Sequence, residues 1–321
     1  MQPYMPLLPT VRRRSVKWAW VLTFQYVLYI GVQLSATSIL RKADGTWEIH
    51  MLANMGTIQV LLLWSNIFLT LLTSILFFVA LIRDRCVSAW TGHTEVNGTD
   101  FIHAVAFMQI FYNASIFLYG TGLLSYPLFT TGSIGGLFES ASLQIFLCMF
   151  CFIWFRGRLE SIGFQSPTDV GKMFFFIIGC YLGITFLLSY VVAPLADLFH
   201  ISLSSAREEG ISREIRDAKQ NSLITILLSF FMTGLFVPIA EEMMFRGVLQ
   251  TYLVKKWGAF WGILIASFWF AIIHIDIALF LPLFIIGLSL GIVRHRFHSL
   301  WASIILHSIN NVVSVILSYQ S

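Results

Sequence analysis

The sequence predicts an all-α fold, a polytopic membrane helix bundle of about eight or nine transmembrane helices. Hydrophobic residues make up 57% of the 321 residues, whereas charged residues make up only 11%. The mean hydropathy is +0.80, and a soluble domain of this length cannot bury so much apolar surface. Apolar stretches long enough to cross the hydrocarbon core of a bilayer, or nearly so, recur along the whole chain.

The predicted spans follow one another with short polar connections. They lie at about 17–40, 58–82, 101–125, 138–155, 173–197, 222–245, 257–279, 281–293 and 299–319. The first span follows a basic N-terminus, but it is too long for a cleaved signal peptide and is predicted to be a membrane helix. In the polar linker before the span at 173–197, Thr168 or Asp169 is a candidate helix N-cap. The connection at 199–221 is predicted to be a solvated amphipathic segment.

Basic residues are concentrated on the connections of one side of the predicted bundle. These are Arg12, Arg13, Arg14, Lys17, Arg83, Arg85, Arg156, Arg158, Lys172, Lys255, Lys256, Arg294 and Arg296. The other side has Arg41, Lys42 and the mixed-charge segment 207–219. Because cytoplasmic connections are enriched in Lys and Arg, the N-terminus is predicted to be cytoplasmic. This bias accounts for the net charge of +4, and no basic stripe interleaved with aromatic residues indicates a nucleic-acid partner.

The chain divides near residue 158. Residues 1–157 are predicted to be N-terminal membrane helices of unassigned role, with scattered polar residues such as His103 and Gln144 but no spacing that indicates chemistry. Residues 158–321 begin with a polar linker and contain every candidate site residue. We therefore expect a membrane core in the second half that carries the function. The sequence gives no sign of the oligomeric state.

The first candidate motif is Glu241-Glu242-Met-Met-Phe-Arg246, directly after an apolar run. Ionisable groups at bilayer depth are expected to face a polar cavity, so their presence indicates a functional site. Glu242 and Arg246 are four residues apart on one helical face, which predicts a supporting ion pair. Glu241 is rotated by about 100° from Glu242 and has no partner on its own helix, so it is the candidate acid or base. The alternative is that all three form a structural network.

Two histidines on later apolar helices complete the candidate site. His274 follows Phe270 by four residues, and His307 precedes Asn311 by four, so that His307 and Asn311 are predicted to point to one side. Two adjacent donors on a rigid helix suit the stabilisation of a developing oxyanion. Asn310 is the weaker alternative to Asn311.

Taken together, these motifs resemble the CAAX-prenyl protease and bacteriocin-processing family (CPBP, or ABI) of intramembrane glutamic endopeptidases. The resemblance rests on Glu-Glu-x-x-x-Arg, Phe-x-x-x-His and His-x-x-x-Asn in this order. The last motif is preceded by Gly287-x-x-x-Gly291 and Ser299-Leu300-Trp301, and the resemblance covers about residues 160–315. It identifies 158–321 as an ABI/CAAX-protease-like catalytic membrane core.

The resemblance implies an intramembrane endopeptidase whose cavity is open to the cytoplasm. It implies that Glu241 and His274 activate the attacking water, that His307 and Asn311 bind the oxyanion, and that Glu242 and Arg246 support them. Possible substrates are prenylated CAAX-type C-termini, or bacterial peptides and membrane proteins, reached from the lipid bilayer. No cofactor is expected. Zinc is disfavoured because the chain has no His-Glu-x-x-His helix and because a zinc site of two His and one Glu would leave Asn311 without a role.

Three other interpretations are open. The chain could keep the same fold as a non-catalytic bacteriocin self-immunity or membrane scaffold protein. Gly287-x-Ser289-x-Gly291 matches a serine hydrolase motif, although that motif needs a strand-to-helix turn and here lies within an apolar helix. A transporter would also place ionisable groups at the midplane, but the sequence contains no inverted repeat.

Overall fold

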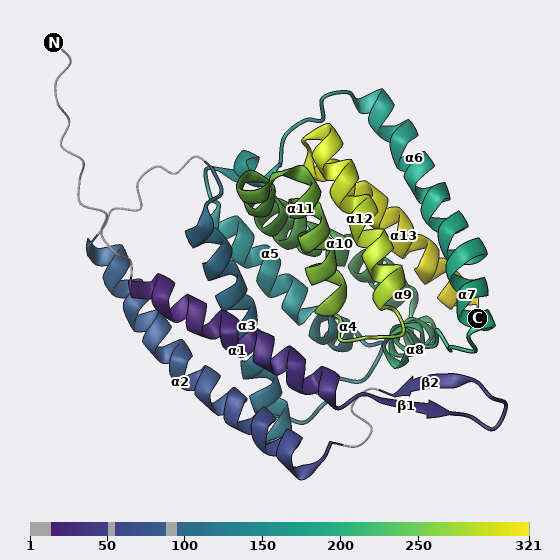
Figure 1. Cartoon of the computed structure of the whole chain (residues 1–321), viewed down its shortest axis with the longest axis horizontal. Helices are drawn as coiled ribbons and strands as arrows, with labels where there is room; N and C mark the ends of the chain where they lie inside the picture. The colour runs from purple at the N-terminus through teal and green to yellow at the C-terminus, as the bar shows by residue number, and fades with distance from the viewer. Residues whose placement is uncertain (1–13, 51–54, 88–94, 321) are drawn as a thin grey trace.

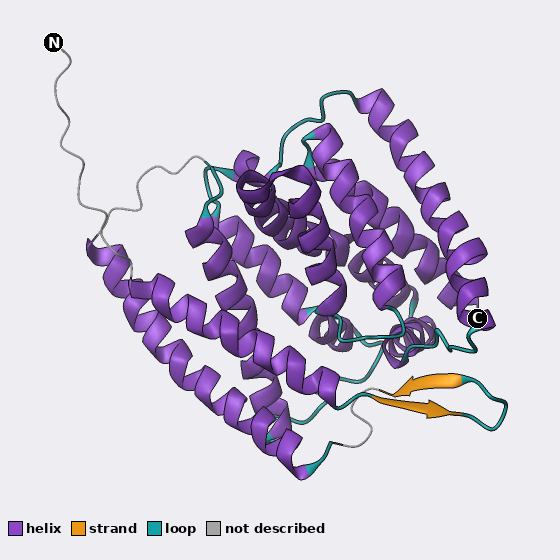
Figure 2. Cartoon of the chain, viewed as in Figure 1, coloured by secondary structure: helices purple, strands orange, loops and turns teal. Residues whose placement is uncertain are grey.

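The computed structural model describes residues 14–50, 55–87 and 95–320, which are mostly helical (Figure 1, Figure 2). Long apolar helices lie side by side, so the predicted all-α membrane bundle is confirmed. Within the described residues, the one sheet is a two-stranded hairpin. Helices dominate because backbone N–H and C=O groups inside a bilayer need partners within their own segment.

The first region ends with residue 154. It consists of α1 (Arg14–Ser35), β1 (Ser38–Arg41), β2 (Trp47–His50), α2 (Thr57–Val87), α3 (Gly98–Gly120), α4 (Ile134–Ser140) and α5 (Ser142–Trp154). The span predicted at about 17–40 is shorter in the structure, because the helix stops at Ser35 and residues 38–41 pair antiparallel with 47–50. A polar turn at Gly45, with φ of +91°, reverses the chain there.

The second region begins at residue 159. It consists of η1 (Leu159–Ile162), α6 (Val170–Leu187), η2 (Leu188–Val192), α7 (Ala193–Leu198), α8 (Ala206–Asn221), α9 (Leu223–Phe231), η3 (Met232–Phe236), α10 (Val237–Glu242), η4 (Met243–Gln250), α11 (Thr251–Ile272), α12 (Phe280–Phe297) and α13 (Leu300–Gln320). The segments η2, η3 and η4 are π-helical, a widened turn that is frequent at functional sites. The Asp169 side chain caps α6 by accepting a hydrogen bond from the Lys172 amide at 2.9 Å, as predicted.

Six described helices are long and apolar enough to cross a membrane, or seven if the bent pair α4 and α5 counts as one span. The expected total of eight or nine is therefore not confirmed. The count treats 223–272 as one helix of 50 residues, which would be about 75 Å long, more than twice the hydrocarbon core. That helix is interrupted at Gly258, with φ of +78°. A Cβ at Gly262 would lie 2.5 Å from the Val254 backbone nitrogen, so the chain folds back on itself there.

The two regions share one hydrophobic core. Leu147 and Cys151 of α5 belong to the same buried cluster as Met243, Met244 and Val248 of η4. A second cluster packs α6 against α12 and α13, through Ile177, Leu290 and Leu306 among others. The helix that carries the first motif therefore lies between α5 on one side and α13 on the other.

The bundle has two distinct ends (Figure 1). At one end, Arg158 pairs with Asp100 at 2.6 Å and Lys255 pairs with Glu95. The other end holds the hairpin and α8, where the Trp47 amide donates to the His200 carbonyl at 2.6 Å. The Lys219 ammonium also donates to the Tyr319 carbonyl at 3.1 Å, which places the end of α13 beside α8.

Candidate active site

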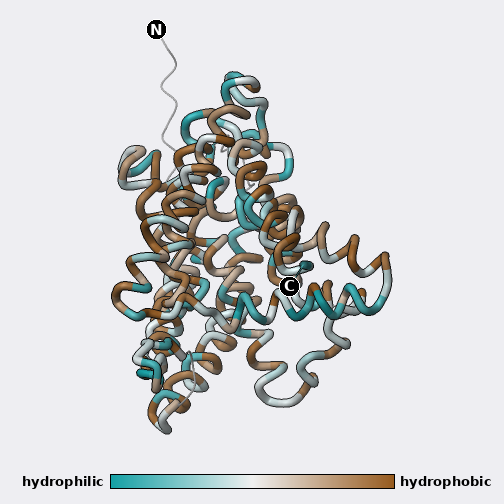
Figure 3. Tube along the Cα trace, turned by 90° about the vertical axis from the view of Figure 1, so that its right-hand side faces the viewer, coloured by the Kyte–Doolittle hydropathy of each residue, from teal (hydrophilic) through white to brown (hydrophobic). Residues whose placement is uncertain are grey.

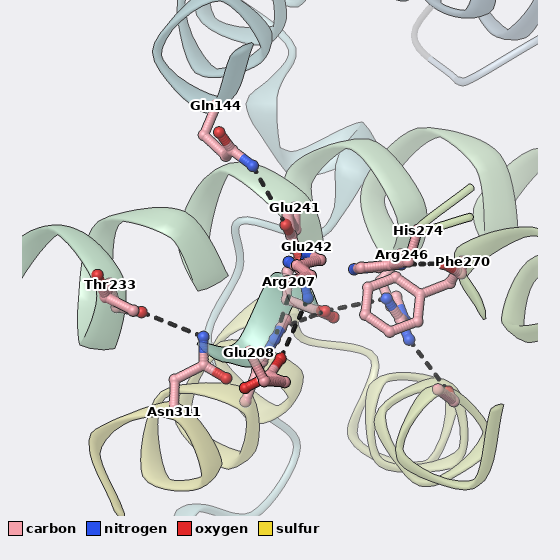
Figure 4. Close-up of polar contacts among 12 residues, drawn as sticks. Gln144, Arg207, Glu208, Thr233, Glu241, Glu242, Arg246, Phe270, His274 and Asn311 are labelled. Atoms are coloured by element: carbon pink, nitrogen blue, oxygen red, sulfur yellow. Dashed lines mark hydrogen bonds and ion pairs between the residues drawn. The ribbon is translucent and has the colours of Figure 1, made fainter. Parts of the chain in front are cut away.

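Glu242 and Arg246 form a fully buried ion pair in the middle of the bundle, as their spacing predicts. The Arg246 Nη1 lies 3.0 Å from Glu242 Oε1. Its Nη2 donates to the Gly287 carbonyl of α12 at 3.1 Å, and the guanidinium lies 4.5 Å from the centre of the Phe270 ring (Figure 4). The pair thus connects α10 and η4 to α11 and α12, and each partner compensates a charge that would otherwise be costly to bury.

Close helix contacts support this ion pair. A Cβ on Gly287 would lie 3.2 Å from Ser267 Cβ, and one on Gly291 would lie 2.8 Å from Ile263 Cγ2. Gln250 of η4 donates to the Gly291 carbonyl at 2.9 Å. The small side chains of the Gly-x-x-x-Gly motif therefore allow α11 and α12 to approach closely, and they expose carbonyls to buried donors.

His307 lies between the two glutamates of the first motif. Its Nδ1 is 3.0 Å from Glu242 Oε1, and its Nε2 is 3.9 Å from Glu241 Oε2. Because an ionised carboxylate only accepts hydrogen bonds, the contact to Glu242 favours a proton on Nδ1. The ring is thereby oriented with Nε2 toward Glu241.

Glu241 is 7% exposed and has contacts from two other helices. Besides His307, Gln144 of α5 donates from Nε2 to Glu241 Oε1 at 3.4 Å (Figure 4). Gln144 was not among the predicted site residues. Gln144 lies on an apolar helix almost one hundred positions before the first motif. The sequence around it does not indicate a site residue, since only the fold brings it to Glu241.

His274 lies just beyond the end of α11. Its Nδ1 is 2.6 Å from the Phe270 carbonyl, so Nδ1 is the donor and Nε2 is the atom able to accept a proton or bind water. The Phe-x-x-x-His spacing thus fixes the tautomer through a backbone contact one helical turn away. The Phe270 ring itself packs on Arg246, which connects the second motif to the ion pair.

Asn311 is held by the π-helical segment η3. Its Nδ2 donates to the Thr233 carbonyl at 3.1 Å (Figure 4). Asn310 and Asn311 both line the cavity described next, so the simple helical spacing does not by itself separate their roles. The contact to Thr233 distinguishes Asn311, because it orients one amide.

One cavity of about 460 Å³ brings the predicted residues together. Glu241, His274, His307 and Asn311 all line it, whereas Glu242 and Arg246 are not among its lining residues. Its apolar wall comes from α6, η2, α12 and α13, with Ile184, Leu188, Leu283 and Ile286 among the lining side chains. The cavity is also lined by the charged pair Arg207 and Glu208 of α8, which were not among the predicted site residues.

The cavity extends from the middle of the bundle to the end that holds α8, opposite the end where Arg158 and Lys255 lie. With the N-terminus in the cytoplasm, as the basic residues predict, the cavity would open away from the cytoplasm. The family resemblance implies a cavity open to the cytoplasm. These two sequence-based expectations exclude each other.

The described residues contain no group of three or more His, Cys, Asp and Glu side chains that could hold a metal ion. The metal-free interpretation of the motifs stays a prediction. Ser289, the centre of the serine hydrolase motif, donates its hydroxyl to the Ile285 carbonyl of its own helix at 3.0 Å.

Comparison with known proteins gives one match. No curated protein and no solved structure matched the chain. A family model described as type II CAAX prenyl endopeptidase Rce1-like matches residues 223–313. That segment contains the first motif, both histidines and Asn311. Over residues 223–313 the chain is therefore similar to the type II CAAX prenyl endopeptidase Rce1-like family, in agreement with the resemblance that its motifs indicated.

Proposed function

We propose that this protein is an intramembrane endopeptidase that hydrolyses a peptide bond with water activated by Glu241 and His274. The family match supports a hydrolase of the CAAX protease type. The observation that carries the proposal is the convergence of Glu241, His274, His307 and Asn311 on one cavity from three helical segments. A carboxylate, an imidazole and two potential donors around one space are the groups that amide hydrolysis needs.

In the proposed reaction, a water molecule binds between the Glu241 carboxylate and Nε2 of His274. Glu241 takes a proton from this water, and the water oxygen attacks the carbonyl carbon of the substrate. The carbonyl oxygen becomes an oxyanion. When the C–N bond breaks, Glu241 returns the proton to the leaving amine. The products are a carboxylic acid and an amine, which then exchange one proton to give a carboxylate and an ammonium.

His307 and Asn311 are proposed to stabilise the oxyanion. Asn311 uses one N–H of its amide on Thr233, which leaves the second for the substrate oxygen. His307 can donate from Nε2 when both ring nitrogens carry a proton, and the contact of its Nδ1 with the Glu242 carboxylate orients the ring for this role. Donors already fixed in position need no reorganisation as charge develops, which is why such groups have large effects on rate.

The remaining groups act as supports in this proposal. The Glu242–Arg246 pair holds His307 and Phe270, and through Phe270 the backbone contact of His274. Gln144 orients Glu241 from α5. Residues 158–321 would then be the catalytic core, and residues 1–157 would contribute helices that fix the position of Glu241.

The substrate is proposed to be a peptide or lipidated peptide that enters from the bilayer. Candidates are prenylated CAAX-type C-termini and bacterial peptides or membrane proteins. The apolar wall formed by α6, α12 and α13 supports an apolar or lipid-modified segment near the scissile bond.

Cleavage by the purified protein tests this function. The protein in detergent would be incubated with a farnesylated CAAX peptide and with unmodified membrane-protein peptides, and the products identified by mass spectrometry. We expect cleavage that survives dialysis against EDTA and is lost in Glu241→Ala. Glu160→Ala, an exposed carboxylate at the other end of the bundle, is the control and should cleave normally. Equal activity in Glu241→Ala and wild type would refute the mechanism. A non-catalytic immunity or scaffold role would give no cleavage of any peptide.

A further inference from the structure

The helix α8 places two charged side chains at the cavity, Arg207 and Glu208. They belong to none of the three sequence motifs and lie before the segment matched by the family model. In the free protein Arg207 Nη1 lies 3.3 Å from Glu208 Oε1, and both side chains are partly exposed, at 40% and 43%. This single contact leaves most of the five guanidinium N–H donors available to another acceptor.

Contacts to two other segments fix α8 at the cavity. Ser205 caps the helix, and its hydroxyl donates to Asp276 in the connection that follows His274. The Ser212 hydroxyl lies 2.9 Å from that of Ser318 at the end of α13. In Figure 3, α8 is the hydrophilic stretch that runs beside the C-terminus. Arg207 is therefore held in place by a rigid element rather than by a free loop.

The charge of Arg207 acts directly on the candidate site. Among the described residues that line the cavity, Arg207 is the only lysine or arginine. It lines the same cavity as His274, and Figure 4 draws it with the other polar residues of the site. A full positive charge next to the proposed water site is expected to attract an anionic group of the substrate.

We propose that Arg207 is a substrate-binding residue that holds a carboxylate of the peptide beside the Glu241–His274 site. The inference rests on the proposed endopeptidase function. An arginine guanidinium matches a carboxylate with two parallel hydrogen bonds, a geometry that lysine cannot reproduce. Glu208 occupies the guanidinium in the free protein, and the substrate carboxylate displaces it. The carboxylate comes from the C-terminus of the peptide or from an Asp or Glu side chain.

Three peptides with one scissile bond distinguish these sources. The first is a farnesylated peptide with a free C-terminal carboxylate, and the second is the same peptide with a C-terminal amide. The third has the amide and an Asp in place of its last residue. Each would be measured with wild type, Arg207→Gln, Arg207→Lys and Glu208→Gln, and thermal unfolding in detergent would verify that each variant is folded.

Wild type should cleave the carboxylate peptide about 10- to 100-fold more efficiently in kcat/KM than the amide peptide, the effect of one charge-assisted pair. Arg207→Gln should lose this preference, mainly through KM, and cleave the amide peptide as wild type does. Arg207→Lys should restore only part of it. Glu208→Gln should lower KM for the carboxylate peptide, because it removes the competing acceptor. If the Asp peptide is cleaved as efficiently as the carboxylate peptide, the site binds side-chain carboxylates. If it is cleaved no better than the amide peptide, the site binds the C-terminus.

Two results would overturn the assignment while the endopeptidase function stands. One is equal cleavage of the carboxylate and amide peptides by wild type. The other is a folded Arg207→Gln variant that loses activity equally on both peptides. Cleavage of none of the three peptides by wild type would refute the proposed function itself, and the carboxylate site with it.

Discussion

Two histidines, His103 in the first region and His274 in the second, show how similar sequence contexts lead to different chemistry. His103 lies on an apolar helix and His274 just beyond the end of one, and each has Nδ1 close to the carbonyl four residues earlier, at 2.7 Å for Thr99 and 2.6 Å for Phe270. The second nitrogen differs. Nε2 of His103 is 3.0 Å from the Ser15 hydroxyl in a closed contact, whereas His274 lines a cavity. A buried histidine is therefore a candidate for catalysis only when its second nitrogen faces space that substrate can enter.

The same contrast separates the buried ion pairs of the two regions. Asp100 and Arg158 lie 2.6 Å apart at one end of the bundle, and Trp154 also donates to Asp100, at 2.9 Å. This pair connects α3 to the chain beyond α5 and is not among the residues that line the candidate site. Glu242 and Arg246 instead contact His307 and Phe270, which line the candidate site. The first pair is placed to hold helices together, and the second to position reactive groups.

The largest expected effect comes from the histidines themselves. His274→Ala and His307→Ala should each reduce peptide cleavage by more than about 10³-fold, because each removes a group that acts on the reacting atoms. His103→Ala should lower thermal stability and leave turnover per folded molecule within a few-fold of wild type. Turnover would be measured on detergent-purified protein with the folded fraction quantified. A His274→Ala variant that is as active as His103→Ala would remove the contrast between the two regions.

Asn311→Ala should lower kcat by about 10²–10³-fold with little change in KM, the usual signature of losing one oxyanion donor. Asn310→Ala is the matched neighbour on the same helix. It should have a mild effect, because its side chain has no contact like that of Asn311 with Thr233 among the described residues. Steady-state kinetics of both variants decide the point. Reversed effects would mean that the facing of α13 assigned here is wrong.

Glu242→Gln and Arg246→Met should reduce stability as well as activity. Removing one partner leaves the other charge buried and unpaired, which destabilises by about 3–5 kcal/mol. Thermal unfolding in detergent would measure the loss. Unchanged unfolding together with lost cleavage would move this pair from a supporting role to a catalytic one.

The orientation of the protein in the membrane decides between two expectations that exclude each other, a cytoplasmic N-terminus and a cavity open to the cytoplasm. Measuring it requires no change in activity. We expect a cytoplasmic N-terminus, so a cysteine at Arg213 of α8 should react with an impermeant maleimide added to intact cells. A cysteine at Arg296, at the opposite end, should be protected until the membrane is permeabilised. The reverse pattern would place the cavity on the cytoplasmic side, as the family resemblance implies, and would favour prenylated C-termini as substrates.

Local sequence patterns predicted the helical spans and the six motif residues because hydrophobicity and i, i+4 spacing act within one helix. The ion pair and the shared cavity follow from such spacing once the helices pack. The hairpin was missed because Ile39 and Leu40 of β1 continue the apolar run of α1, so that the first strand reads as the end of one apolar span. Gln144 and Arg207 were missed for a different reason. Their roles depend on α5 and α8 meeting the motif helices, which no single segment encodes.

The coupling between Glu241 and His274 tests the central claim most directly. Conservative variants, Glu241→Asp and His274→Gln, would be measured alone and together in single-turnover cleavage of one peptide. If both residues act on the same water, the double variant should lose about as much rate as the more damaging single variant, since groups that act as a unit are not additive. Losses that multiply would show that the two residues act independently and would contradict a shared water site in this cavity.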